Sequence, residues 1–174
     1  LAVAEIMGLS VESAAKALSE FLGTERRFEI RGEVSGITII DDYAHHPTEI
    51  RATLAAARQR YPHKELWAVW QPHTYTRTEK LFTQFLDAFD DADHVLVTEI
   101  FPSREPVRKD FSSKQVVQSM KHVDVKFLAS KVEVVDHLLT ELNSDDVVIV
   151  LSAGDAHLIS EQVVEKLSLN GNAK

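Results

Sequence analysis

The sequence predicts an α/β fold: a doubly wound, mostly parallel sheet of about six strands, with an N-terminal hairpin and a leading helical segment. The first observation behind this prediction is that short apolar runs, typical of buried strands, alternate with stretches whose apolar residues recur at helical spacing. Strict strand–helix alternation favours a parallel sheet with right-handed crossovers. The second is size, because 174 residues, 44% of them hydrophobic, suffice for one well-packed core.

The first part of the chain predicts a short helical segment ahead of the sheet. Residues 1–21 place apolar side chains at helical spacing with an interruption at Gly8, and Ser10 is well placed to cap the second piece. An amphipathic start of this kind suggests the tail of a preceding domain. We therefore expect residues 1–24 to end that domain and residues 25–174 to form one α/β domain.

The remaining elements follow from periodicity and turn chemistry. Residues 27–34 and 37–42 predict a hairpin whose two-residue turn is Ser35-Gly36. Further strands are predicted at residues 66–71, 95–100, 125–129 and 147–151. Helical stripes lie at residues 50–57, 81–89, 116–120, 135–142 and 159–167. Capping boxes at residues 76–79 and 112–115 predict two of the helix starts.

The composition excludes several classes of protein. The net charge of −8 argues against nonspecific nucleic-acid binding, which needs a basic face. No apolar run is long enough to cross a bilayer and no segment resembles a signal peptide, so we expect no membrane partner. Cysteine is absent, which excludes disulfides, thiolate metal sites and a cysteine nucleophile. These features are consistent with a cytoplasmic protein.

The loops that leave the predicted strands hold most of the reactive side chains of the chain. They comprise residues 41–46, 71–77, 99–104 and 152–157. The carboxyl ends of parallel strands meet at one edge of the sheet, where open α/β folds bind their ligands. This edge is therefore the candidate functional site.

The densest of these loops is Asp41-Asp42-Tyr43-Ala44-His45-His46, which ends at a Pro that opens a helix. One interpretation is contact with a small ligand, and another is a metal site, since carboxylates and neutral imidazoles bind divalent ions. Adjacent residues of an extended segment point in opposite directions, which weakens the metal hypothesis. A third interpretation is structural: a buried carboxylate caps the next helix and a histidine binds backbone.

Three other segments carry candidate residues. Arg77 follows a strand and falls in the first turn of a helix, where it could hold a carboxylate or phosphate, or else be a solvated surface arginine. The pair Arg26-Arg27 at the hairpin entrance is either a phosphate contact or a solvated charge pair. The turn at residues 152–155 is expected to be structural, with Asp155 as an N-cap.

The glycines form neither of the two common phosphate-binding loops, G-x-x-x-x-G-K-[ST] and G-x-G-x-x-G. If the protein meets a nucleotide, another domain must hold most of its phosphates.

The segment Asp42-Tyr43-Ala44-His45-His46-Pro47 resembles the C-terminal-domain signature of the Mur ligases. Three further matches occur in the same order: Phe21-x-Gly23-x-x-Arg26-Arg27-Phe28-Glu29, Gln71-Pro72-His73-x-Tyr75-x-Arg77-Thr78 and Ser152-Ala153-Gly154-Asp155. Within the family, Tyr43 and Glu49 favour the member that adds L-alanine over the member that recycles murein tripeptide.

The resemblance implies a three-domain enzyme, of which this chain is the Rossmann-like C-terminal domain. Its partners would be an N-terminal UDP-binding domain and a central ATPase domain, which would bind most of the ATP and Mg²⁺. In the family, ATP phosphorylates the carboxylate of UDP-N-acetylmuramate, and the amine of L-alanine attacks the acyl phosphate. The C-terminal domain closes over the central one, so the resemblance predicts that this chain alone is inactive.

The resemblance also implies roles for individual residues. Arg27 would contact an ATP phosphate, and Asp42 would contact the ATP ribose. Tyr43 and His45 would face the incoming amino acid, and Arg77 would hold its carboxylate. No residue of this chain is implied as a catalytic group or as a metal ligand.

Two histidines and one departure complete the implied site. His46 and His73 are additional candidates, and His46 could instead orient the turn. Some family members have a basic residue where Thr74 stands, so Arg77 could act alone on the alanine carboxylate. Two other classes stay open from the residues: a non-catalytic module that binds anions or nucleotides, and a metal-dependent hydrolase that uses Asp42, His45 and His73.

Overall fold

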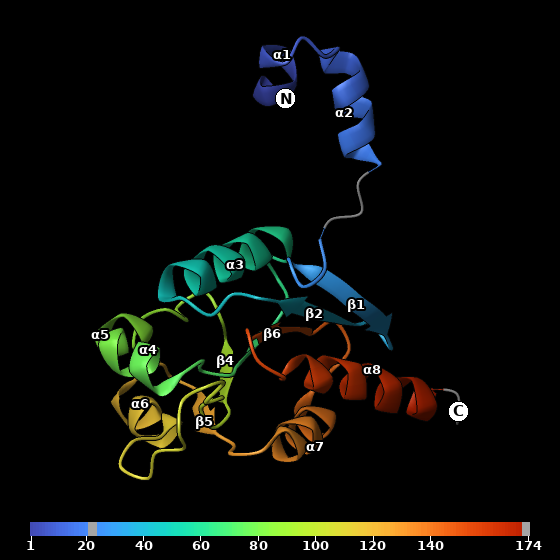
Figure 1. The fold of residues 1–174 in the computed structure, drawn as a ribbon. Helices are drawn as coiled ribbons and strands as arrows, with labels where there is room; N and C mark the ends of the chain where they lie inside the picture. The colour runs from blue at the N-terminus through green and yellow to red at the C-terminus, as the bar shows by residue number, and fades with distance from the viewer. Residues whose placement is uncertain (21–23, 172–174) are drawn as a thin grey trace.

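The computed structural model describes residues 1–20 and 24–171. Its sheet has six strands in the order β1-β2-β6-β3-β4-β5, and Figure 1 shows helices on both faces. β1 is antiparallel to β2, and all other neighbouring strands are parallel. The predicted doubly wound, mostly parallel sheet with an N-terminal hairpin is confirmed.

The strands are β1 (Glu29–Val34), β2 (Ile37–Asp42), β3 (Leu66–Trp70), β4 (His94–Val97), β5 (Val125–Phe127) and β6 (Val147–Leu151). The helices are α1 (Ala2–Ile6), α2 (Val11–Ser19), α3 (Pro47–Arg60), α4 (Tyr75–Lys80), α5 (Phe82–Phe85), α6 (Ser113–Ser119), α7 (Lys131–Glu141) and α8 (His157–Gly171). The strands end slightly earlier than predicted in β3, β4 and β5, which gives the connecting loops more length at the candidate edge.

The hairpin turn follows the sequence prediction. Ser35 has φ 54° and Gly36 has φ 84°, so both central residues lie in the left-handed region. This is the arrangement that matches the right-handed twist of paired strands in a two-residue hairpin. The turn fixes the register of β1 on β2, in which Glu29 lies opposite Asp41.

The core has one layer on each side of the sheet. Helices α3, α5 and α6 pack on one face, with Leu54, Phe85 and Val116 among their buried residues. Helices α7 and α8 pack on the other face, where Leu138 and Ile159 are buried. The three central strands β2, β3 and β6 are buried along their whole length, so the sheet is a rigid platform for the loops at its edge.

The leading segment forms two helices separated at Gly8, as predicted, and the Ser10 hydroxyl accepts the Ser13 N–H at the start of α2. Neither helix buries a residue. Most of the predicted domain boundary, and Phe21 and Gly23 of the matched signature, lie outside the described residues. None of the described helices is long and apolar enough to cross a membrane.

Two predictions about the segment after β3 are wrong. The helix begins at Tyr75 rather than after a cap at Thr76, and the Thr76 N–H donates to the Glu105 carboxylate instead of a local cap. Of the predicted helical stripe at residues 81–89, only α5 (Phe82–Phe85) is helical, and Leu81 separates it from α4, which ends at Lys80. The apolar stripe is nevertheless buried as expected, at Phe85 and Phe89.

Candidate ligand-binding site

A row of side chains follows the edge of the sheet at the carboxyl ends of β2 and β3. We call this edge, with residues 27, 43, 45, 73 and 77, the rim. The Tyr43 and His45 rings have centroids 5.4 Å apart, and His45 and His73 are 5.8 Å apart. The Arg27 guanidinium lies 5.7 Å from the centre of the Tyr43 ring. Arg27, Tyr43, His45 and His73 are therefore successive neighbours, although they come from three separate segments.

Asp42 anchors the turn from which this row projects. It is only 6% exposed, and its two carboxylate oxygens each accept a backbone N–H at 2.7 Å, from Phe28 and from Ala44. One side chain thus ties the loop before β1 to the end of β2. The structural alternative named from the sequence, a buried carboxylate that caps the next helix, is correct for the burial of Asp42 and wrong for the cap, because the N-cap of α3 is His46.

The start of α3 fixes the two histidines of the turn. His46 is the N-cap, and its Nδ1 accepts the Thr48 N–H at 3.3 Å. The Glu49 carboxylate accepts the N–H groups of His45 and His46. Burial alone would raise the pKa of Glu49, but these two hydrogen bonds hold the pKa below its usual value. His46 therefore orients the turn.

His45 is held in one tautomer by its own loop. Its Nδ1 lies 2.8 Å from the Tyr43 carbonyl oxygen, which can only accept, so Nδ1 carries the hydrogen. With the hydrogen on Nδ1, the acceptor lone pair of the unprotonated ring is at Nε2. His45 thus offers an acceptor to a ligand at the rim, beside a Tyr43 ring that is 38% exposed.

Arg77 continues the row beyond His73. It lines a cavity of about 380 Å³ together with Thr74, Thr76, Lys80, Leu81 and Glu105. Among the described residues, neither the buried Nη1 of Arg77 nor the buried Nδ1 of His73 has a hydrogen-bond partner. Burial lowers the pKa of His73, and the nearby charges of Arg77 and His45 lower it further, so this ring is neutral near pH 7.

Glu105, from the loop after β4, lines the same cavity as Arg77, and no local pattern in the sequence predicts it. Its carboxylate accepts the Thr76 N–H at 3.1 Å, at the start of α4. Burial alone would raise the pKa of Glu105, but hydrogen bonds from Thr76, Thr74 and Tyr75 lower it. The Thr76 N–H at the start of α4 is therefore occupied by a carboxylate of the chain itself.

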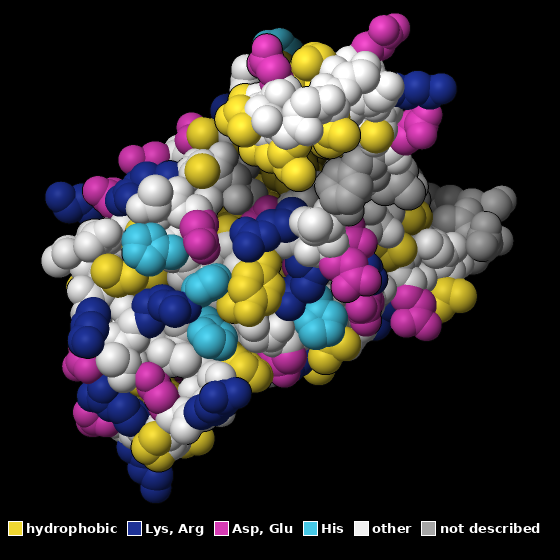
Figure 2. Space-filling view, turned by 45° about the horizontal axis from the view of Figure 1, so that its top comes forward, with side chains coloured by type: hydrophobic (Ala, Val, Ile, Leu, Met, Phe, Trp, Pro, Cys, Tyr) yellow, Lys and Arg dark blue, Asp and Glu magenta, His cyan; other side chains and the backbone are white. Residues whose placement is uncertain are grey.

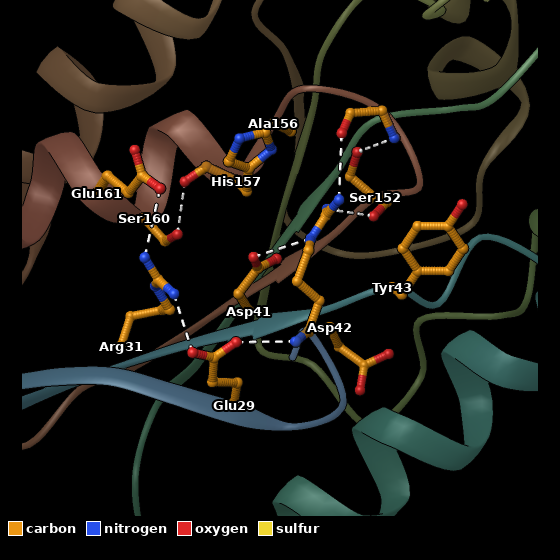
Figure 3. A network of polar contacts seen from close by, with 12 residues as sticks. Glu29, Arg31, Asp41, Asp42, Tyr43, Ser152, Ala156, His157, Ser160 and Glu161 are labelled. Carbon is orange, nitrogen blue, oxygen red and sulfur yellow. Dashed lines mark hydrogen bonds and ion pairs between the residues drawn. The ribbon is translucent and has the colours of Figure 1, made fainter. Parts of the chain in front are cut away.

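Arg26 is neither of the two things that the sequence suggested for the pair Arg26-Arg27, because its side chain is bound inside the domain. Its Nε donates to Asp41 Oδ2 at 3.1 Å, and its terminal nitrogens donate to the carbonyls of Ser152 and Gly154 at 2.5 and 3.3 Å. Figure 3 labels two of these partners, Asp41 and Ser152. Asp41 is 1% exposed, and burial raises its pKa although Arg26 and His157 oppose the shift. A buried carboxylate at the end of an apolar strand requires a cation, and that was the available signal.

The loop after β6 is held by a second polar network. The Gln71 side-chain oxygen accepts from the Ser152 hydroxyl at 2.8 Å and the Ala156 N–H at 3.2 Å, and its amide donates to Asp155. Asp155 also accepts from Lys131, at the start of α7. The prediction that Asp155 is an N-cap is wrong, because α8 begins at His157 and the Asp155 carboxylate is directed towards β3 and α7.

The sequence hypothesis of a metal-dependent hydrolase does not hold in the part of the chain that the structure describes. No three His, Asp or Glu side chains there are grouped so that they could hold a metal ion. Asp42 gives both oxygens to backbone donors, whereas His45 and His73 meet ring to ring. These three residues therefore do not form a ligand set.

Figure 2 shows one face of the molecule, on which histidine side chains lie among Lys and Arg side chains. Asp and Glu side chains are also present on this face. Arginines beside imidazole rings are suited to an anionic small ligand.

A family model described as "Mur ligase, glutamate ligase domain" matches residues 26–154. The chain belongs to the Mur ligase family. The match covers both the turn at residues 41–46 and the loop after β3, so the rim of this Mur ligase domain lies within the family region.

Individual relatives agree with this assignment. The UDP-N-acetylmuramate–L-alanine ligase of Caldanaerobacter subterraneus subsp. tengcongensis is 40% identical over 168 residues, which cover 95% of this chain and 36% of the relative. The structure of UDP-N-acetylmuramate-alanine ligase from Thermotoga maritima has a TM-score of 0.80 at 27% identity, covering 97% of this chain and 36% of that one. A murein peptide ligase from Psychrobacter arcticus has a TM-score of 0.71 at 28% identity, covering 95% and 35% respectively. The chain thus spans about a third of the length of these proteins.

Proposed function

We propose that this chain is the C-terminal domain of an ATP-dependent ligase that joins L-alanine to UDP-N-acetylmuramate in peptidoglycan precursor synthesis. The observation that carries the proposal is the row of neighbouring side chains Arg27, Tyr43, His45 and His73, with Arg77 four residues after His73. A cation at each end with aromatic rings between suits two ligands, one bearing phosphates and one bearing a carboxylate. The similarity to alanine ligases over 95% of the chain supports the same assignment.

Arg27 and Asp42 are the proposed ATP contacts. Arg27 is exposed and, among the described residues, makes no ion pair, so its guanidinium is free to bind a phosphate. Asp42 lies in the next segment, and a carboxylate has about four acceptor positions, of which two are used by backbone N–H groups. The remaining capacity fits a ribose hydroxyl.

Tyr43, His45 and Arg77 are the proposed contacts of the incoming amino acid. The unpartnered Nη1 of Arg77 is suited to the carboxylate, and Thr74 adds no second cation there. The free Nε2 of His45 can accept a hydrogen from the amino group, with the Tyr43 ring beside it. His73 lies between them, and it would position the ligand as a neutral hydrogen-bonding group.

The rest of the ligase is proposed to hold the phosphates of ATP and the Mg²⁺ that ligases of this family use. When bound, they would supply an activated carboxyl phosphate of UDP-N-acetylmuramate, which the amine of L-alanine attacks. Residues 1–24 would end the preceding central domain, and residues 25–174 would form the C-terminal domain. The exposed apolar side chains of α1 and α2, such as Ile6 and Leu18, would be covered by that central domain. We place the enzyme in the cytoplasm, where ATP is available.

Phosphate release tests the proposal. The complete protein that carries this chain is expected to release phosphate from ATP when both UDP-N-acetylmuramate and L-alanine are present, and the 174-residue chain alone is expected to release none. Activity of the chain alone, or failure of the complete protein to use L-alanine, would contradict it.

Two added measurements separate the alternatives. If murein tripeptide replaces L-alanine as the accepted amine, the protein is instead a recycling ligase like its murein peptide relative. If calorimetry shows tight ATP binding by the chain alone, a non-catalytic nucleotide-binding module is favoured, because the ligase hypothesis predicts weak binding or none.

A further inference from the structure

Three segments of the chain meet at the side chain of Arg26. Its guanidinium donates to Asp41 at the end of β2 and to the carbonyls of Ser152 and Gly154 in the loop after β6. The Arg26 N–H donates to Glu29 Oε2 at 2.8 Å, which fixes its own loop against β1. The Arg26 side chain is 21% exposed, and each of its three guanidinium nitrogens donates to an acceptor within the domain.

The backbone of residues 26–28 forms a sharp turn that leaves Arg27 exposed. Arg26 has φ 54° and Phe28 has φ 51°, both in the left-handed region that non-glycine residues rarely adopt. The conformation persists because Glu29 accepts the Arg26 N–H and Asp42 accepts the Phe28 N–H. Arg27 stands between these two fixed residues and is exposed.

Arg26 also holds Tyr43. The Tyr43 N–H donates to the Arg26 carbonyl at 2.7 Å. The Arg26 guanidinium lies 5.3 Å from the centre of the Tyr43 ring, within cation–π range. Arg26 thus constrains the position of Arg27, which follows it in the chain, and that of Tyr43, which it contacts twice.

We propose that Arg26 is a positioning residue that couples the nucleotide contact Arg27 to the amino-acid contact Tyr43. This inference rests on the proposed function, which assigns a ligand to each of those two residues. Arg26 touches neither ligand. It sets the distance between Arg27 and Tyr43 by joining the turn at residues 26–28, the end of β2 and the loop after β6.

A purely structural role is the alternative, because removal of Arg26 leaves Asp41 as a buried, unpaired charge. Three variants separate the two roles. Arg26→Gln with Asp41→Asn removes the arginine without stranding the carboxylate. Arg26→Lys keeps the ion pair with Asp41, but a single ammonium cannot reproduce the planar fork that reaches both carbonyls. Arg31→Gln is the matched control, since Arg31 on β1 pairs with Glu29 of the same strand and with Glu161 of α8.

The kinetic experiment uses the complete protein with ATP, UDP-N-acetylmuramate and L-alanine. In the double variant and in Arg26→Lys, KM for ATP and KM for L-alanine are expected to rise together by about tenfold, with a smaller change in kcat. Arg31→Gln should leave both within about twofold of the wild type. A rise in only one of the two KM values in the double variant would overturn the coupling. Wild-type KM values and wild-type stability in Arg26→Lys would also overturn it, because the ion pair with Asp41 alone would then be sufficient.

Amide hydrogen exchange on the 174-residue chain gives a readout that does not depend on ligase activity. Exchange at Tyr43 N–H should accelerate by about tenfold in the double variant, whereas the Ile40 amide within β2 should be unchanged. Unchanged protection of Tyr43 would refute the proposal. If the wild-type protein shows no ligase activity but Tyr43 exchange responds, the proposed function fails and the Arg26 connection stands.

Discussion

Two adjacent arginines of this protein have opposite environments, and the local backbone explains the difference. Positive φ at Arg26 and Phe28 turns Arg26 inward to Asp41 and leaves Arg27 exposed. From the sequence the pair could be recognised only as a candidate phosphate contact, because two neighbouring letters do not reveal which one is buried. The carboxylate of Asp41 indicated that one of the two arginines is buried, since a charge in an apolar strand needs a partner.

Gly154 illustrates a residue whose size is fixed by its neighbours. A Cβ at this position would lie 2.5 Å from Gln71 Oε1 and 2.7 Å from Phe101 Cγ. Gly154→Ala is therefore expected to lower the free energy of unfolding by about 1–3 kcal/mol, measured by urea denaturation. Gly32→Ala is the control, because its Cβ would meet only Val164 methyl groups at 3.1 Å, which can shift. Equal, small effects of both substitutions would contradict this packing account.

Asp41 predicts an unusual pH dependence. Burial raises its pKa in the folded protein, so the folded state holds the proton to a higher pH than the unfolded state. Its contribution to stability is complete below the unfolded pKa and is lost as pH rises through the folded pKa. The difference in unfolding free energy between wild type and Asp41→Asn should therefore fall as pH increases from about 3. A difference that grows with pH would show that Arg26 outweighs burial.

At the scale of elements, the sequence predicts strands and helix starts well where the determinants are local. The capping box at Ser112 and Gln115 is observed, and α3 begins at Pro47 as predicted, because each start depends on residues within one turn. The predicted cap at Thr76 is wrong, because Glu105, a residue 29 positions away, supplies the acceptor. Long-range partners of this kind are invisible to a local pattern.

Asp124, beside the edge strand β5, is expected to change stability with pH in the opposite direction to Asp41. Asp124, just before β5, accepts from His94 Nδ1 at 2.6 Å, and this hydrogen bond lowers the Asp124 pKa. A lowered folded pKa gives stability that is present above the unfolded value of 3.8 and is lost as pH falls through the folded pKa.

Urea denaturation at several pH values tests this linkage. The difference in unfolding free energy between wild type and Asp124→Asn should shrink as pH decreases from about 5 to about 3. Lys166→Ala serves as the control, because it removes an exposed ion pair between α8 and Asp136 of α7. It should show no such trend. A constant difference for Asp124→Asn would mean that the His94 contact does not contribute.

At the scale of the whole molecule, the parallel sheet brings distant segments to one edge. Residues 27, 43, 45, 73 and 77 become neighbours because β2 and β3 flank β6 with their carboxyl ends on the same side. Alternation in the sequence was enough to predict the edge. It was not enough to predict that Arg26 and Glu105 complete it, since both depend on tertiary contacts.

The central claim is that this rim has a nucleotide end at Arg27 and an amino-acid end at Arg77. Steady-state kinetics of Arg27→Ala and Arg77→Ala in the complete protein test it most directly, with Lys166→Ala as control. Loss of a charge-assisted hydrogen bond costs about 1.5–3 kcal/mol, or about 10- to 150-fold in kcat/KM. We predict that Arg27→Ala raises KM for ATP and Arg77→Ala raises KM for L-alanine. Unchanged constants in both variants, or the reverse pairing, would contradict the account.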